Sequence, residues 1–256
     1  MASGKALNFC DRLFNVVVAA LLIGAGLFAG YSLWDNQQVF ALASDVQSSL
    51  LGMRPKEGED NKPTFDQLRA INPDVIAWIT LDGTNIDYPV VQGKDDLEYI
   101  NKDVYGDFAL SGAIFLSSEC SSDLSDAYSL IYGHHMANSQ MFGDLDLYLD
   151  QDFFNQNTTG VLMTPDATYS LEVFDVLTVN SSDSTIFSPT SWKTDCKGAV
   201  EYAAAHATNV HQDVVDKIVT AGAGERVVAL ATCSSEGTEA RTIVLARIVP
   251  YESTGK

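Results

Sequence analysis

The chain has 256 residues, 46% of them hydrophobic and 10% aromatic, which fits one medium domain with appendages and a full hydrophobic core. Its formal net charge is −19, from 15 Lys and Arg residues against 34 Asp and Glu residues. This balance, without any cluster of basic residues, argues against a nucleic-acid partner, because phosphate binding needs a basic surface.

The first element in chain order is an apolar run near the N-terminus. Residues 13–34 read "LFNVVVAALLIGAGLFAGYSLW" and contain no charge. A helix of this length rises about 33 Å, the thickness of the hydrocarbon core of a bilayer. Lys5 and Arg12 precede the run and Asp35 follows it, so the positive-inside rule predicts a cytoplasmic N-terminus and an extracellular remainder. The alternative is a cleaved signal peptide ending at the "ALA" of 41–43, but the run is long for one and this site lies well beyond it.

A polar connection follows the apolar run. Residues 35–62 are weakly periodic, the charged stretch at 54–63 predicts a linker, and part of 39–51 fits an amphipathic helix. A second helix is expected to begin with Thr64 as its N-cap and to stop at the Asn-Pro pair of 72–73. The predicted organisation is a cytoplasmic tail at 1–12, a single transmembrane anchor at 13–34, an extracellular linker with a helical segment at 35–63, and the main folded domain at 64–256.

The main domain is mostly strand-like. Strands are expected at 75–81, 85–92, 112–116, 128–133, 160–164, 168–179, 226–233 and 241–249. Helices are expected at 139–150 and 197–210. Many short strands with turn signals and few helices predict a mainly β fold, a closed antiparallel or mixed barrel.

Three residues at predicted strand ends carry candidate chemistry. Cys233 ends one strand, Arg241 begins the next, and His134 follows an apolar strand and a glycine. A cysteine attacks carbonyls as the thiolate, which a nearby imidazole or guanidinium favours. The histidine can protonate a leaving amine, and the arginine can hold an oxyanion or the substrate backbone. Taken singly, each has a commoner explanation: a structural thiol, a non-catalytic histidine and a solvated edge charge.

The motifs around these residues are more specific than the residues alone. Residues 229–233 read "ALATC", Arg241 follows on the next strand, and "YGHHM" lies upstream, a combination that resembles the sortases, the membrane-anchored cysteine transpeptidases of Gram-positive surfaces. Their strand end is TLxTC-like, and Ala229 in place of its leading threonine is a mild departure. Residues 71–116, the stretch "IYGHHMANSQMFGDL" and a helix at 197–210 are similar to class B members in particular.

The resemblance covers roughly residues 65–250 and implies a sortase-type β-barrel as the catalytic domain. It implies Cys233 as nucleophile, His134 as acid and base, and Arg241 as oxyanion or substrate clamp. The implied reaction cleaves a C-terminal sorting motif of a surface protein or pilin and forms a thioester. An amine of a peptidoglycan crossbridge or a pilin lysine then resolves it, without a metal or other cofactor. A cysteine peptidase that only hydrolyses, and a non-catalytic anchored binding module, are the rival hypotheses.

Several neighbouring residues leave alternatives open. His135 competes with His134, but the family pattern places the catalytic imidazole directly after the glycine. Thr232 orients the thiol or the substrate, or is simply a β-branched strand residue. Whether Cys120 and Cys196 form a disulfide cannot be read from the sequence.

Three further expectations concern the surroundings of these residues. Residues 234–236 belong to the loop after the nucleophile by position only. His206 and His211 are expected at the surface. The acidic stretch 144–152 lacks the glycine and ligand spacing of a calcium loop and is expected to be an exposed helix face.

Overall fold

The computed structural model describes residues 2–136, 138–222, 224–233 and 239–252, and for residues 2–8, 10, 11 and 233 it describes the backbone alone. Internal contacts divide the chain into two units, Met1–Ala41 and Leu42–Lys256. Helix α1 (Ala2–Leu51) makes up the first unit and begins the second. By length and composition, its part from Arg12 onward is long and apolar enough to cross a membrane.

Helix α1 continues through residues 35–51, where the sequence predicted a linker with at most a partial helix. No Gly or Pro interrupts this stretch before Gly52, so nothing in the backbone chemistry ends the helix earlier. Its last turns belong to the second unit, where Leu50 is buried and Gln47 donates to the carbonyl of Asn85 at 3.1 Å. Tertiary contacts therefore stabilise a helix that a polar sequence only weakly favours.

Helix α2 (Lys62–Ile71) begins two residues before the predicted N-cap. Asn61 precedes the helix and Pro63 lies in its first turn, where a missing N–H costs nothing. The prediction that Thr64 is the N-cap was therefore wrong, whereas the helix ends at Asn72 as expected.

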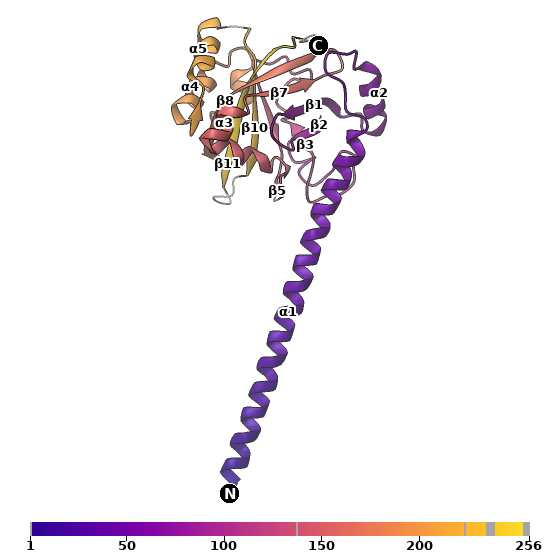
Figure 1. Ribbon diagram of the computed structural model, residues 1–256, viewed down its shortest axis with the longest axis vertical. Helices are drawn as coiled ribbons and strands as arrows, with labels where there is room; N and C mark the ends of the chain where they lie inside the picture. The colour runs from indigo at the N-terminus through magenta and orange to yellow at the C-terminus, as the bar shows by residue number, and fades with distance from the viewer. Residues whose placement is uncertain (1, 137, 223, 234–238, 253–256) are drawn as a thin grey trace. The chain divides into compact units, whose positions relative to one another are not determined.

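Eight strands of the described chain close into a mixed barrel (Figure 1). They are β1 (Val75–Leu81), β2 (Asp87–Val91), β3 (Ile114–Leu116), β4 (Tyr128–Tyr132), β7 (Thr159–Met163), β8 (Thr168–Asn180), β10 (Val227–Cys233) and β11 (Ala240–Pro250). Their order is β11-β10-β4-β3-β2-β1-β7-β8, and β8 pairs back with β11. The pairs β2–β3 and β4–β10 are parallel and the others antiparallel. The predicted closed barrel with few helices is confirmed.

The remaining elements lie outside the closed wall. They are β5 (His135–Met136) and β6 (Gln140–Met141), which form a small hairpin; β9 (Asn209–Val210), which pairs with β8; the 3-10 helices η1 (Gly143–Leu149) and η2 (Pro189–Trp192); and the helices α3 (Gln151–Gln156), α4 (Lys197–His206) and α5 (Gln212–Ala221). Helices α4 and α5 pack together beside β8, on one flank of the barrel (Figure 1).

Two helix predictions need correction. The helix expected at 139–150 is a strand followed by the 3-10 helix η1, and the helix expected at 197–210 ends at His206. Asn209 draws the chain into β9, because its side-chain amide donates to the carbonyls of Tyr148 and Leu149. Helix α5, which buries Val214, Val215 and Ile218, was not predicted.

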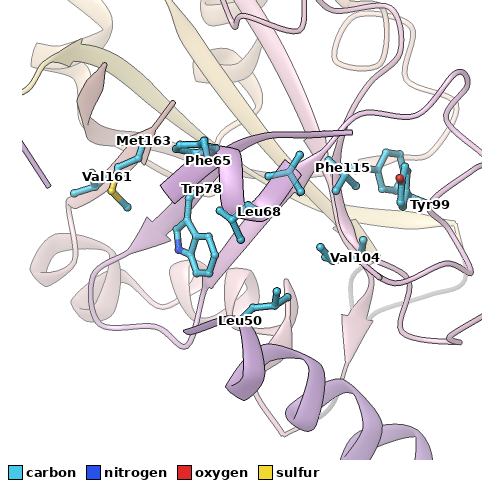
Figure 2. Close-up of a cluster of buried hydrophobic side chains, with 12 residues drawn as sticks. Leu50, Phe65, Leu68, Trp78, Tyr99, Val104, Phe115, Val161 and Met163 are labelled. Atoms are coloured by element: carbon cyan, nitrogen blue, oxygen red, sulfur yellow. The ribbon is translucent and has the colours of Figure 1, made fainter. Parts of the chain in front are cut away.

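An apolar cluster fills the space between α2, β1 and the end of α1 (Figure 2). Trp78 and Phe65 are fully buried in it, and Leu50 joins it from α1. Burying each of these large side chains contributes roughly 2–3 kcal/mol to the free energy of unfolding. The cluster packs β1 and β2 against α2 and the end of α1, because Val75, Trp78 and Val91 belong to it.

Candidate active site

A cavity of about 390 Å³ opens where β4, β10 and β11 meet their loops. The residues that line it come from segments far apart in the sequence: Asp96, Leu97, Ile100, Phe115, Tyr132, Gly133, His134, Ser181, Phe187, Ala231, Thr232 and Arg241. Three of the four predicted site residues, His134, Thr232 and Arg241, therefore face one cavity. Most of its lining is apolar, with Asp96 and Arg241 as charged members.

His134 is placed by the glycine before it. A Cβ on Gly133 would lie 2.5 Å from Cδ1 of Ile114 and 2.7 Å from the Phe142 ring, so a larger residue would push the segment out of position. The Nε2 of His134 lies 2.6 Å from the carbonyl oxygen of Ile100. A carbonyl only accepts hydrogen bonds, so Nε2 carries the proton and Nδ1 is the basic nitrogen of the neutral ring.

Strands β10 and β11 bring Cys233 and Arg241 into register as direct partners, and Thr232 opposite Thr242. Thr232 is buried, and its hydroxyl has no hydrogen-bond partner within the described residues. A buried hydroxyl that lines a cavity without a partner is available to a bound ligand. The backbone of Cys233 ends β10, while its side chain and residues 234–236 lie outside the described part of the chain.

The guanidinium of Arg241 makes few polar contacts with the described residues. Its Nη1 donates to the carbonyl of Ala240 at 3.3 Å, and no carboxylate in the described ranges lies within 4.0 Å of it. It lies near Tyr132, whose pKa is raised mainly by burial and pulled back by the positive charge of Arg241. The arginine thus keeps planar donors for a group in the cavity.

The loop after β8 also lines the cavity, through Ser181 and Phe187, and Asp183 holds this loop in place. Burial alone would raise the pKa of the Asp183 carboxyl, but the hydroxyl of Tyr202 at 2.5 Å and the N–H groups of Ile186 and Thr185 hold it below its usual value. The loop presents Phe187, whose ring stacks on Tyr132 at 6.3 Å between centroids. Since Tyr202 lies on α4, this helix fixes one side of the cavity.

Comparisons with known proteins show the family to which the chain belongs. A Sortase domain model matches residues 79–249. The chain belongs to the sortase family. Sortase B of Staphylococcus aureus is 27% identical over 244 residues, covering 93% of this chain and 98% of that protein.

Solved structures extend the match. A Streptococcus pyogenes class B sortase involved in pilus biogenesis has a TM-score of 0.64 and 36% identity, covering 72% of this chain and 97% of that one. A Staphylococcus aureus sortase B–substrate complex has a TM-score of 0.65 and 25% identity, over 83% of this chain and 94% of that one. The predicted class B resemblance is confirmed, and so is the prediction of an enzyme, because sortases are cysteine transpeptidases.

The second histidine of this sortase, His135, is not among the residues that line the cavity. His135 Nε2 lies 3.2 Å from Oδ2 of Asp146, and the hydroxyl of Thr242 donates to Oδ1 of the same carboxylate at 2.6 Å. Asp144 is buried and accepts from the N–H of Asn85 at 2.8 Å. The expectation that 144–152 is an exposed helix face was therefore wrong for these two aspartates. The signal in the sequence was the alternation of Asp with Leu145 and Leu147, which does not fit a simple exposed face.

The other cysteines and histidines that the sequence singled out in this domain do not line the cavity. Cys120 and Cys196 are both buried and free, and burial raises the pKa of each thiol to about 11. His206 is exposed as predicted, but His211 is half-buried and stacks on Phe154 at 4.3 Å between centroids. In the described ranges, no group of three or more His, Cys, Asp or Glu residues is arranged to hold a metal ion.

Proposed function

We propose that this sortase cleaves a C-terminal sorting motif of surface proteins or pilins and transfers the acyl group to an amine. The observation that carries the proposal is the shared cavity: His134, Thr232 and Arg241 line it, and the strand that supplies Thr232 ends at Cys233. The Streptococcus pyogenes relative is involved in pilus biogenesis, which supports pilins among the substrates.

In the first half of the reaction, the Cys233 thiolate attacks the scissile carbonyl and a C–S bond forms. The guanidinium of Arg241 stabilises the oxyanion, a contribution of about 3 kcal/mol for one such donor. His134 gives a proton to the leaving amine as the C–N bond breaks. Since Nε2 is engaged by Ile100, the proton comes from Nδ1 of the imidazolium.

In the second half, an amine of a peptidoglycan crossbridge or a pilin lysine attacks the thioester. It loses a proton to Nδ1 of His134, and the thiolate of Cys233 leaves as the new amide forms. The hydroxyl of Thr232, which has no partner among the described residues, binds the substrate backbone in both halves.

We also propose that the chain is a single-pass protein of the cell membrane with a cytoplasmic N-terminus and an extracellular catalytic domain. Arg12 precedes the apolar part of α1 and Asp35 follows it, and the helix is long enough to span a bilayer. A sortase held in this way meets its substrates as they leave the cell.

The test is a screen of pentapeptides with the full chain in detergent micelles, with and without hydroxylamine. Transfer predicts that the hydroxamate product replaces the free acid as the hydroxylamine concentration rises, and that Cys233→Ala forms neither. If only the acid accumulates at every concentration, the chain is a peptidase. If the wild-type chain and Cys233→Ala behave alike, the cavity is not an active site.

A further inference from the structure

One carboxylate joins the two segments that carry His134 and Arg241. Asp146, on η1, contacts His135 Nε2 at 3.2 Å with one oxygen and accepts from the hydroxyl of Thr242 at 2.6 Å with the other. We propose that Asp146 is a positioning residue, which holds the imidazole of His134 and the guanidinium of Arg241 in one geometry. The inference rests on the proposed function, because that function gives these two groups a common task.

The carboxylate of Asp146 bridges His135 and Thr242, and the hairpin that carries His135 needs such tertiary contacts to keep its position. His135 begins a hairpin whose strands have only two residues each. Asn138, Ser139 and Met141 follow with φ of 62°, 59° and 52°, and each left-handed non-glycine residue costs about 1 kcal/mol or more. Such a hairpin does not hold itself in place. Its tertiary contacts include the bond from the N–H of Met141 to the Tyr88 hydroxyl at 2.9 Å and the contact of His135 with Asp146.

The arginine side of the bridge is rigid. Thr242 is fully buried, follows Arg241 directly and is paired with Thr232 on β10. The hydroxyl of Thr242 donates to the carboxylate of Asp146 at a distance of 2.6 Å. Such a charge-assisted hydrogen bond is roughly twice as strong as a neutral one. Helix η1 also contacts both β10 and β11. The carboxylate thus ties the hairpin to a fixed point of the barrel wall.

The consequence is a dependence of rate on a residue that does not line the cavity. A misplacement of about 1 Å at a catalytic group costs up to about 100-fold in rate. A residue that only stabilised the fold would lower the melting temperature and leave kcat unchanged at temperatures where the chain is folded. Positioning instead lowers kcat with little change in KM.

The experiment compares matched variants of the full chain in detergent micelles, using the peptide identified by the screen. Asp146→Asn keeps the size of the side chain but cannot accept from both partners, and Thr242→Val keeps the shape but removes the donor. Both are expected to lower kcat by about 10- to 100-fold with KM changed by less than about twofold. Thr242→Ser keeps the hydroxyl, and its kcat is expected to stay within about threefold of the wild-type value.

Asp144→Asn is the control, because Asp144 is a buried carboxylate on the same 3-10 helix that binds Asn85 instead. It is expected to lower the melting temperature while leaving kcat within about twofold. Equal losses of kcat for Asp144→Asn and Asp146→Asn, or equal activity of Thr242→Val and Thr242→Ser, would overturn the proposal.

A second measurement does not depend on turnover. The rate at which iodoacetamide alkylates Cys233 reports its thiolate, which the imidazole and the guanidinium stabilise. The tryptic peptide 227–241 contains Cys233 as its single cysteine, so mass spectrometry reads this rate directly. Asp146→Asn is expected to slow alkylation by about tenfold relative to Asp144→Asn. If no peptide is cleaved, the proposed function fails while this rate still decides the positioning role: an unchanged rate contradicts it.

Discussion

The apolar cluster beside α2 and the cavity at the ends of β4, β10 and β11 lie in the same barrel but are built in opposite ways. In the cluster, Trp78 is fully buried and its indole N–H donates to Asp87 at 2.6 Å. At the cavity, the buried hydroxyl of Thr232 has no partner among the described residues, and Arg241 has no carboxylate there within ion-pair distance. Polar groups left without partners cost stability and are kept where a ligand will bind them. The cluster therefore contributes stability, and the cavity holds the groups to which the proposed function assigns the reaction.

The largest expected effect that tests this division is the loss of the nucleophile. Cys233→Ala is expected to lower peptide cleavage by at least about 10⁴-fold without changing the melting temperature, because the proposed mechanism makes its thiol the group that forms the covalent intermediate. Cys196→Ala is the matched control: burial raises the pKa of its thiol to about 11, so it is not a nucleophile near neutral pH. Loss of cleavage in Cys196→Ala, or its retention in Cys233→Ala, would break the division.

A truncation in the apolar cluster should lower stability and leave the rate of catalysis unchanged. Phe65→Ala removes a fully buried ring and is expected to lower the free energy of unfolding by about 4 kcal/mol, measured by urea denaturation. Its kcat at 25 °C, where the chain is still folded, is expected to stay within about twofold of the wild-type value. A tenfold loss of kcat in the folded variant would show that cluster and cavity are coupled.

The carboxyl group of Asp175, on β8, is another buried polar group of the barrel wall that lacks a partner in the described chain. Asp175 is fully buried, neither of its carboxylate oxygens has a hydrogen-bond partner in the described chain, and burial raises its pKa to about 8. The folded chain therefore binds this proton more tightly than the unfolded chain does. The protonated carboxyl of Asp175 stabilises the folded chain at low pH. The free energy of unfolding therefore falls as the pH rises from about 4 to about 8.

Asp175→Asn should remove this loss. Between pH 5 and pH 8 the wild-type chain is expected to lose on the order of 3 kcal/mol more than the variant, measured by urea denaturation at each pH. Asp183→Asn is expected to lower stability throughout this range, because hydrogen bonds hold the pKa of Asp183 below its usual value and its charged form is stabilising; the wild-type chain loses this contribution only as the pH falls below about 4. Parallel stability curves for wild type and Asp175→Asn would contradict the assignment.

A smaller effect distinguishes the two arginines of β11. Arg241→Lys keeps the charge but loses the planar fork, and is expected to lower kcat by about 30- to 100-fold. Arg247→Lys, on the same strand, removes a fork bound to Glu225 at 2.6 and 2.9 Å and is expected to affect stability without changing kcat. Equal values of kcat in the two variants would show that the cavity does not use the guanidinium of Arg241.

The sequence by itself determined the strands and the motif. Residues 75–81 were predicted as a strand and are β1, and the other seven predicted barrel strands lie within two residues of the observed ones, because period-two alternation and β-branched content are local properties. The ends of helices were less well predicted: Pro63 starts α2 earlier than the cap signal of Thr64, and helix α5 was missed. The family motif located His134, Cys233 and Arg241 along the chain.

Only the tertiary structure decided which of these residues meet. The parallel pairing of β4 with β10 places the segment after Tyr132 beside Thr232, and nothing local in either strand encodes that pairing. The carboxylate of Asp146, which contacts His135, also binds Thr242, 96 residues further along the chain. Such contacts depend on barrel closure, which is set by the burial of all the strands together, whereas periodicity and caps report only on neighbours along the chain.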